Sequence, residues 1–255
     1  MKHYELTKQK NIRDIGGMIT QDGRRIKYGH IYRGPTLKVR SDEDIKIIKS
    51  FNLTDVIDFR NHDECLTSPD YYLEGVNYHI LPSFEDKQDR KLKGEDGNLL
   101  WFIDEGVSGH DHLLYTYDIL ITSKQSQNAY RELFNILLQD DKRVYFHCSQ
   151  GKDRTGVAAY LIEIGLGVSE KEAREDYLYS NLMMQGRVEH LIEKVKDKPF
   201  YNETYQQSLK DVFAVKEEYL DNAIRMMNEH YGGTLNYLKD ILKVDLERLK
   251  ALYLE

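Results

Sequence analysis

Short β-prone runs alternate with longer amphipathic stretches along this chain. Residues 53–60, 76–82 and 143–146 are rich in apolar and β-prone side chains and are bounded by polar or turn-forming residues, as is typical of buried strands. Residues 126–138 instead place apolar side chains three and four positions apart, the spacing of one face of a helix. Because helices separate the strands, we expect parallel strands buried on both faces. The pattern predicts an α/β fold with a central, mostly parallel sheet flanked by helices.

Cap and turn signals predict further elements. The Asp-Gly pair at residues 22–23 is typical of a hairpin turn. Ser41 precedes three acidic residues and several isoleucines, which predicts a helix that begins there and runs to about Ser50. Residues 84–112 are charged and punctuated by glycine, which predicts a lid or mobile loop. The C-terminal third keeps a helical period, so we expect residues 185–255 to form a helical extension packed on the core.

Composition narrows the class of protein. With 255 residues, 40% of them hydrophobic, the chain can bury the core of one globular domain, so we expect residues 1–255 to form a single domain. No apolar run reaches the length of a membrane span, and the charged start is unlike a signal peptide. Two cysteines, Cys65 and Cys148, are too few for a disulfide framework and fit a reducing compartment. We therefore expect a cytoplasmic protein, with a secreted parent whose signal has been removed as the open alternative. Metal-ligand spacing is absent from the sequence, and we expect neither a metal nor a cofactor.

Charge is distributed unevenly. The net charge is −7, yet residues 1–40 carry ten Lys or Arg against three Asp or Glu. An acidic protein binds nucleic acid poorly, so we expect no nucleic-acid partner. The basic N-terminal segment favours an anionic substrate if it folds beside the site, and a solvated basic surface explains it equally well.

Candidate chemistry concentrates in the run His-Cys-Ser-Gln-Gly-Lys-Asp-Arg-Thr-Gly, residues 147–156. It joins the predicted strand 143–146 to an apolar run that predicts a helix over residues 157–164. The first turn of a helix leaves backbone N–H groups unpaired and carries the positive end of the macrodipole, so such a loop can bind an anion. A cysteine that faces this cradle has a stabilised thiolate and a lowered pKa. Cys148 is therefore predicted to be a nucleophile.

Three more residues of the run fit phosphate chemistry. Arg154, six positions after the cysteine, has a planar guanidinium that can hold two oxygens of a phosphoryl group. Gly151 allows close approach of the backbone, and Thr155 can hydrogen-bond the sulfur when it departs. An ATP-binding loop is excluded because Asp153 follows the Gly-Lys pair where Ser or Thr is needed. A lone buried cysteine is usually inert, but the arginine spacing and the strand-to-helix position favour a functional site.

The C-x5-R-T pattern of this run resembles that of the cysteine-dependent protein-tyrosine-phosphatase superfamily, and C-x-x-G-K-D-R is similar to its atypical bacterial branch. The boxes N-I-R-D-I-G-G at residues 11–17 and D-Y-L-Y-S-N at residues 176–181 also resemble that branch, so the resemblance covers nearly the whole chain. It implies the fold of those phosphatases, with a helical C-terminal third. It also implies hydrolysis of phosphotyrosine, with phosphoserine, phosphothreonine or phosphoinositides as further substrates.

The resemblance implies roles for particular residues. Cys148, Asp153 and Arg154 are the expected catalytic residues. The phosphate-binding loop is expected to comprise Ser149, Gln150, Gly151, Lys152, Asp153, Arg154 and Thr155. Lys152 would add a second positive charge at the rim, which suits multiply phosphorylated substrates such as phosphoinositides.

Support for the loop is expected from its neighbours. Asp58 and Arg60, in a segment similar to the family's I-D-L-R-x-x-x-E element, are expected to brace it, and a strand-end ion pair is the alternative. His147 either tunes the thiol or is a hydrogen-bonded wall residue. Some relatives protect the nucleophile as a disulfide, so a bridge between Cys65 and Cys148 is a further hypothesis.

Two questions stay open at this level. The general acid is Asp153, as the branch implies, or Asp86, which matches the position of the acid in dual-specificity phosphatases; we favour Asp153. The loop could also belong to a catalytically silent phosphate-binding module or to a rhodanese-type sulfurtransferase. The silent module is disfavoured because Cys148, Arg154 and Thr155 are all intact. The sulfurtransferase is disfavoured by the arginine spacing and by the Lys-Asp-Arg triplet.

Overall fold

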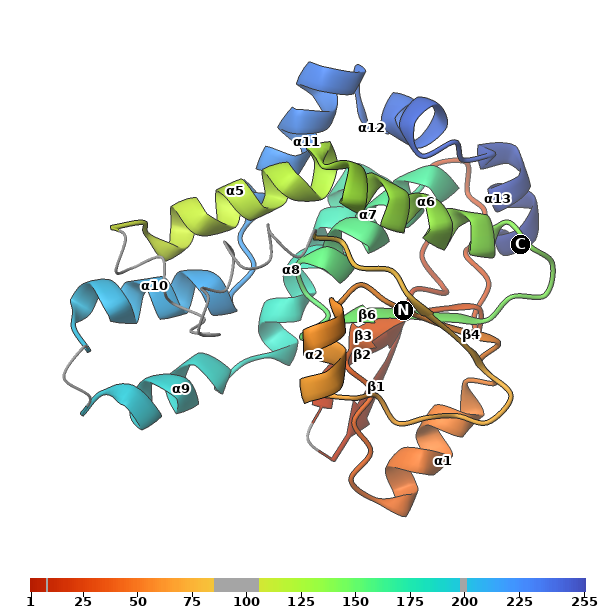
Figure 1. Cartoon of the computed structure of the whole chain (residues 1–255). Coiled ribbons are helices and arrows are strands. Elements are labelled where there is room, and N and C mark those ends of the chain that lie inside the picture. The colour runs from red at the N-terminus through yellow and green to blue at the C-terminus, as the bar shows by residue number, and fades with distance from the viewer. Residues whose placement is uncertain (8, 85–105, 198–200) are drawn as a thin grey trace.

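A six-stranded sheet forms the centre of the computed structural model, which describes residues 1–7, 9–84, 106–197 and 201–255 (Figure 1). The strand order is β1-β2-β3-β6-β4-β5. The strands are β1 (Lys2–Leu6), β2 (Gln9–Asp14), β3 (Ile31–Pro35), β4 (Asp55–Asp58), β5 (Asn77–Ile80) and β6 (Val144–Cys148). Strands β3, β6, β4 and β5 pair in parallel, whereas β1 and β2 are antiparallel additions at one edge. The predicted mostly parallel sheet is confirmed.

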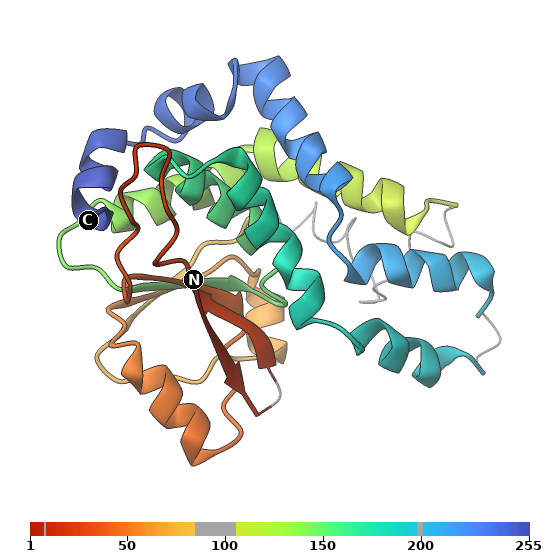
Figure 2. The ribbon, with the colours of Figure 1, turned by 180° about the vertical axis from the view of Figure 1, so that it is seen from behind.

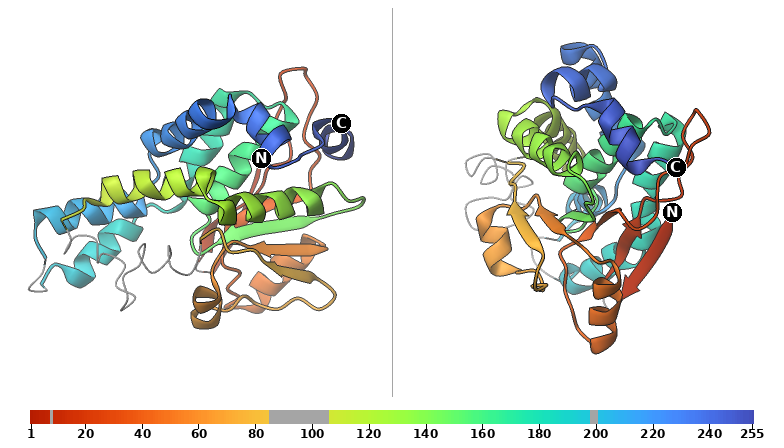
Figure 3. Two further views of the ribbon diagram at one scale, coloured as in Figure 1. Left: turned by 45° about the horizontal axis from the view of Figure 1, so that its top comes forward. Right: turned by 90° about the vertical axis from the view of Figure 1, so that its right-hand side faces the viewer.

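Helices cover both faces of this sheet (Figures 1 and 3). They are α1 (Asp42–Ser50), α2 (His62–Thr67), α5 (Gly109–Thr122), α6 (Lys124–Leu137), α7 (Arg154–Leu166), α8 (Glu170–Met183), α9 (Arg187–Val195), α10 (Glu203–Phe213), α11 (Glu217–Tyr231), α12 (Thr234–Asn236), a π-helical turn (Tyr237–Ile241) and α13 (Leu246–Tyr253). The predicted α/β class and the helical C-terminal third are both confirmed. Ser41 caps α1 through its side chain, as its position predicted.

Successive side chains of β6 point to two different hydrophobic cores, one on each face of the sheet. Val144, Phe146 and Cys148 point to the larger core, which includes side chains of α5, α6, α7, α8, α11 and α13. Tyr145 points to the smaller core, which includes side chains of α1. Successive residues of a strand face opposite sides of the sheet, so the sequence of this strand places Cys148 on the face covered by α7.

The carboxyl ends of three parallel strands meet beside Cys148. Pro35 of β3 is in register with Cys148, and Asp58 of β4 is in register with His147. Ligand sites of open α/β sheets lie at this edge, outside the carboxyl ends of the strands. The topology therefore brings residues from distant parts of the chain around one loop.

Two peripheral parts complete the fold. The segment around the Asp-Gly turn at residues 22–23 runs beside the C-terminus, where Ile26 forms an isolated bridge with Leu254 (Figure 2). At the other end of the molecule, α10 lies against α5, and α9 packs on α10 through a small apolar cluster of its own (Figure 3).

The predicted lid over residues 84–112 falls largely outside the described residues, which resume at residue 106. Residues 109–112 form the first turn of α5, whose N-terminus is capped by Ser108. The described helices include none that is long and apolar enough to cross a membrane.

Candidate active site

The loop between β6 and α7 holds the predicted nucleophile. Cys148 ends β6 and is buried, and Arg154 is the first residue of α7. Gly151 has a φ of +70°, and a Cβ there would lie 2.3 Å from the carbonyl carbon of Gly34. A side chain at this position would collide with the backbone of β3, so the loop requires glycine.

The carbonyl groups of Gln150 and Gly151 point toward the supporting side chains, away from the site. Asn11 donates from Nδ2 to the carbonyl oxygens of Gln150 and Gly151, both at 3.1 Å, and Arg33 donates from Nη2 to the Gly151 oxygen at 3.1 Å. Because the N–H of a peptide unit points opposite to its carbonyl, the following amides face the other side of the loop. Successive N–H groups turned to one side form an anion-binding concavity.

Buried ion pairs hold these supporting residues in place. Arg13 donates from Nε to Asp176 at 2.6 Å and from Nη1 to Asn11 at 2.7 Å, and Arg33 also pairs with Asp176. The two arginines and the aspartate are fully buried. Two of the sequence boxes, at residues 11–17 and 176–181, therefore meet behind the loop.

Arg154 is held by Glu64, a residue to which the sequence alone gave no role. The guanidinium Nη1 lies 2.8 Å from Oε2 of Glu64, and Nη2 lies 3.1 Å from Oε1. Ser149 donates to the same carboxylate at 2.5 Å. Glu64 is fixed by a capping box at the start of α2, where Asn61 is the N-cap. One carboxylate therefore orients two residues of the phosphate-binding loop.

The thiol of Cys148 is poised for ionisation. Burial alone would raise its pKa. The positive charge of Arg154 and favourable interactions with the hydroxyl and backbone N–H of Thr155 outweigh this effect, so the pKa of Cys148 lies below its ordinary value. A thiolate at neutral pH is a strong nucleophile.

Asp153 lies between two donors. Its Oδ1 accepts a hydrogen bond of 3.0 Å from the hydroxyl of Tyr117 on α5, and its Oδ2 lies 3.1 Å from Nζ of Lys152. Asp86, the alternative acid, lies outside the described residues. The described part of the site thus offers Asp153 as a carboxyl group within the nucleophile loop.

The rim position predicted for the side chain of Lys152 is wrong. Its side chain is only 4% exposed, and Nζ binds the carbonyl oxygens of Val212 and Ala214 as well as Asp153. These carbonyls end α10, and the last turn of a helix attracts a cation. The ammonium group therefore ties the loop to α10 and does not face an incoming substrate.

The other supporting residues predicted from the sequence form a salt-bridge network. Arg60 donates to both carboxylate oxygens of Asp58 and, at 2.8 Å, to Asp70. Its Nη1 reaches Thr36 at 3.0 Å, and the Thr36 hydroxyl in turn donates to the carbonyl of Ser149 at 3.4 Å. Arg60 thus contacts the loop through Thr36.

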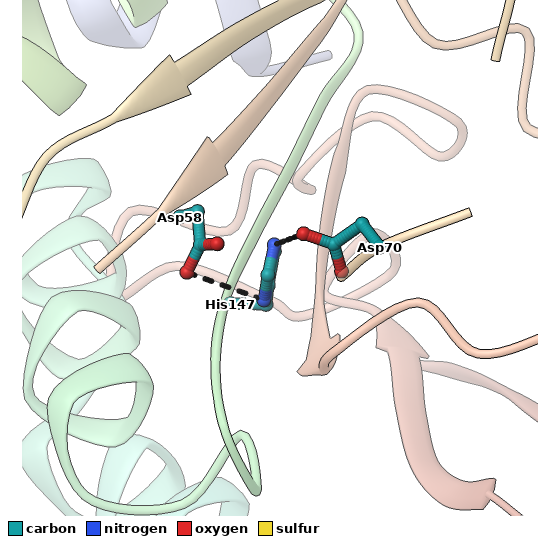
Figure 4. Close-up of side chains that lie close together, drawn as sticks. All are labelled: Asp58, Asp70 and His147. Atoms are coloured by element: carbon teal, nitrogen blue, oxygen red, sulfur yellow. Dashed lines mark ion pairs between the residues drawn. The ribbon is translucent and has the colours of Figure 1, made fainter. Parts of the chain in front are cut away.

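His147 lies between two carboxylates (Figure 4). Because it directly precedes Cys148 in β6, its side chain lies on the opposite face of the sheet from the thiol. Its Nε2 is 3.3 Å from Asp70, and its Nδ1 is 3.8 Å from Asp58. Burial would lower the pKa of His147, but the two carboxylates raise it above the usual value. The three side chains lie close enough to chelate a metal ion. The guanidinium of Arg60 already binds both carboxylates, so the cluster is a charge-balanced network and is poorly suited to a cation.

Cys65 belongs to this network as well. Its thiol donates to Asp58 at 3.2 Å, and both cysteines are free. Burial and the Asp58 carboxylate raise the pKa of Cys65 to about 12. The two thiols therefore differ: Cys148 is set up to ionise, and Cys65 is held protonated.

A strand, a loop with its amides turned to one side, and a helix that begins with arginine together surround an ionisable thiol. This arrangement can bind a tetrahedral dianion and attack its phosphorus, as cysteine-dependent phosphatases do. A family model described as "Tyrosine phosphatase family" matches residues 4–255. The chain belongs to this family and is a tyrosine phosphatase.

Two relatives in sequence agree with this assignment. A protein of Cupriavidus necator, named for tyrosine-protein phosphatase activity, is 27% identical over 257 residues, covering 96% of this chain and 85% of that protein. The triple specificity protein phosphatase PtpB of Mycobacterium tuberculosis is 26% identical over 283 residues, covering 98% of each. Among solved structures, P. aeruginosa TpbA in complex with phosphotyrosine matches with a TM-score of 0.30 and 16% identity, covering 80% of this chain and 90% of that one.

Proposed function

We propose that this phosphatase hydrolyses phosphotyrosine in two steps through a phosphocysteine at Cys148. In the first step the thiolate forms a bond to phosphorus, the bond from phosphorus to the tyrosine oxygen breaks, and Asp153 gives its proton to the departing oxygen. In the second step water attacks the phosphocysteine, Asp153 takes a proton from it, and the thiolate and inorganic phosphate are released. Arg154 and the loop amides stabilise the phosphoryl oxygens throughout.

The observation that carries this proposal is the pairing of the thiol with Arg154. The guanidinium lowers the pKa of Cys148, and the same group can receive the phosphoryl oxygens. The N–H groups of Gly151 and Lys152 add donors, because Asn11 and Arg33 turn the preceding carbonyls away.

The role of general acid rests on the contacts of Asp153. Its position within the nucleophile loop and its two fixed donors support it as the group that exchanges a proton with the leaving oxygen. If Asp86 were the acid, Asp153→Asn would keep the basic limb of the pH–rate profile and Asp86→Asn would lose it. We expect the opposite result.

Phosphotyrosine is the substrate that the family assignment favours. PtpB is named for triple specificity, which supports a substrate range wider than phosphotyrosine here. Besides the family resemblance, the argument for phosphoinositides used Lys152 at the rim. Because its ammonium group binds the end of α10, that argument no longer favours a multiply phosphorylated lipid.

The proposal extends to the whole chain and its surroundings. The larger core joins side chains from Ile15 to Leu254, which supports residues 1–255 acting as one domain. Two free cysteines, one of them the nucleophile, suit a reducing compartment, which supports a cytoplasmic location.

Turnover by Cys148→Ser tests the function. The serine hydroxyl does not ionise at neutral pH, so we expect no hydrolysis of p-nitrophenyl phosphate or phosphotyrosine peptides, while phosphate still binds. A panel of phosphoserine, phosphothreonine and phosphoinositide substrates, with and without chelator, defines the range. Turnover by Cys148→Ser at the wild-type rate would overturn the proposal, and binding of phosphotyrosine by a wild-type protein that never turns it over would indicate a silent binding module.

A further inference from the structure

The general acid is itself held by a buried hydroxyl on another helix. We propose that Tyr117, supported by Tyr177, is a positioning residue that fixes Asp153 for proton transfer. This inference rests on the proposed role of Asp153 as acid. It adds residues from α5 and α8 to a site that the sequence confined to one loop and its neighbours.

The hydrogen bonds have a defined direction. The hydroxyl of Tyr117 donates to Oδ1 of Asp153 at 3.0 Å, and its oxygen lies 2.7 Å from the hydroxyl oxygen of Tyr177. A tyrosine hydroxyl has one proton. Because Tyr117 uses that proton for the carboxylate, Tyr177 must donate to Tyr117. The result is a chain of donors that runs from Tyr177 through Tyr117 to Asp153.

Both tyrosines are rigid. They lie in the main core with the side chains fully buried, and their rings meet edge to face with centroids 6.3 Å apart. Tyr219 of α11 also packs against Tyr117, with ring centroids 5.8 Å apart. Three helices therefore fix the hydroxyl that holds Asp153, and the carboxyl group has little freedom to turn away.

The second oxygen of Asp153 is held from a different side. Nζ of Lys152 lies 3.1 Å from Oδ2 and is anchored by the carbonyls of Val212 and Ala214. Asp153 therefore has one donor at each carboxylate oxygen, and loss of the Tyr117 hydroxyl would leave its carboxyl group less firmly oriented.

Other charged and titratable side chains also face Asp153. The charged and titratable side chains that interact with it come from α5, α8, α11 and its own loop: His112, Tyr117, Tyr177, Tyr219, Cys148 and Lys152. Burial lowers the pKa of His112 to about 4, and burial raises the pKa of Tyr117 and Tyr177 well above the usual value. These three groups stay neutral across the working range, so a shift of the limb on losing the Tyr117 hydroxyl reports Asp153.

The test compares pH–rate profiles of three single variants. Tyr117→Phe removes the donor to Asp153, and Tyr177→Phe removes only its support. Tyr253→Phe is the matched control, because Tyr253 is a buried tyrosine whose hydroxyl donates to the carbonyl of Leu137, at 2.8 Å, in a different part of the core. Each variant is assayed with phosphotyrosine and with p-nitrophenyl phosphate, whose better leaving group needs less help from an acid.

We expect Tyr117→Phe to lower kcat for phosphotyrosine about tenfold, because one hydrogen bond to a charged group is lost. KM should change less than about twofold. The loss with p-nitrophenyl phosphate should be smaller, and the basic limb of the profile should differ from that of the wild type. Tyr177→Phe should act in the same direction and more weakly, and Tyr253→Phe should match the wild type.

A double variant separates this inference from the assignment of the acid. In an Asp153→Asn background, the basic limb should already be lost, and Tyr117→Phe should have no further effect on kcat. If Asp153→Asn keeps the limb, the assignment of the acid is wrong and the inference falls with it. If Asp153→Asn loses the limb but Tyr117→Phe behaves like Tyr253→Phe, the inference alone is overturned. Should Tyr117→Phe fail to fold, the profile of Tyr177→Phe decides: a wild-type limb there overturns the inference.

Discussion

Both terminal nitrogens of Arg154 bind the carboxylate of Glu64, with Nη1 2.8 Å from Oε2 and Nη2 3.1 Å from Oε1. The guanidinium is thus held in one plane by a residue 90 positions away in the sequence. A guanidinium held in this way loses little conformational freedom when it binds a phosphoryl group. The pair connects α2, at the end of β4, to the first turn of α7.

Glu64→Gln tests this relationship. The amide keeps the shape of the side chain and removes its charge, so Arg154 loses its fixed orientation and Ser149 loses a strong acceptor. We expect kcat/KM for phosphotyrosine to fall about 10- to 100-fold, equivalent to about 1.4–2.7 kcal/mol of transition-state stabilisation. Steady-state kinetics measure it, with the exposed Glu132→Gln on α6 as control. A variant with wild-type kcat/KM would show that Arg154 needs no such support.

Asn11→Ala tests the supports behind the loop. The variant removes the two hydrogen bonds that Asn11 donates to the carbonyls of Gln150 and Gly151, together with the one it accepts from Arg13, and frees those peptide units to rotate. We expect a weaker affinity for inorganic phosphate by about tenfold, because the amides no longer face the anion. Competitive inhibition by phosphate measures the change. An unaltered inhibition constant in a folded variant would mean that Arg33 alone orients the loop.

Alkylation by iodoacetamide as a function of pH tests the state of the nucleophile. The pKa of Cys148 lies below that of a free thiol, so its modification rate should reach a plateau at a pH where an ordinary cysteine is still mostly protonated. Cys65, with a pKa raised to about 12, is the internal control and should remain unmodified over the same range. Arg154→Lys is a comparison variant that keeps a positive charge but loses the planar guanidinium. Peptide mapping by mass spectrometry assigns the label, and preferential labelling of Cys65 would contradict the account.

His147 should make stability depend on pH. Its pKa is raised in the folded protein, because Asp58 and Asp70 favour the imidazolium more than burial disfavours it. The stabilisation is therefore complete below the unfolded value of about 6.5 and is lost as the pH rises through the folded value. Urea denaturation from pH 5 upwards measures it, in a Cys148→Ser background that removes the titration of the thiol. His147→Gln should flatten this decline, and an equal decline in both proteins would exclude His147 as its cause.

The sequence predicted those parts of the site that lie close together along the chain. The strand before Cys148, the helix after it and the spacing to Arg154 all fall within residues 143–166, so short-range patterns suffice to place them. The same patterns place Asp153 in the loop. The mostly parallel sheet followed from the alternation of strands and helices.

The rest of the site depends on contacts between distant segments. Asn11 reaches the loop across about 140 positions, and Tyr117 reaches Asp153 across 36, and neither distance is encoded in a local pattern. Lys152 shows the limit most clearly. Its charge was evident from the sequence, but the direction of its side chain was set by Val212 and Ala214 at the end of α10.

The most direct test of the central claim is acid-quenched mass spectrometry of the enzyme during turnover of phosphotyrosine. We expect one phosphoryl group on the peptide that contains Cys148. In Asp153→Asn the group should accumulate further when the substrate is p-nitrophenyl phosphate, because its leaving group needs little help from an acid in the first step and the variant lacks the base for the second. Turnover without a phosphoryl group on Cys148, or with the group on another residue, would contradict the account.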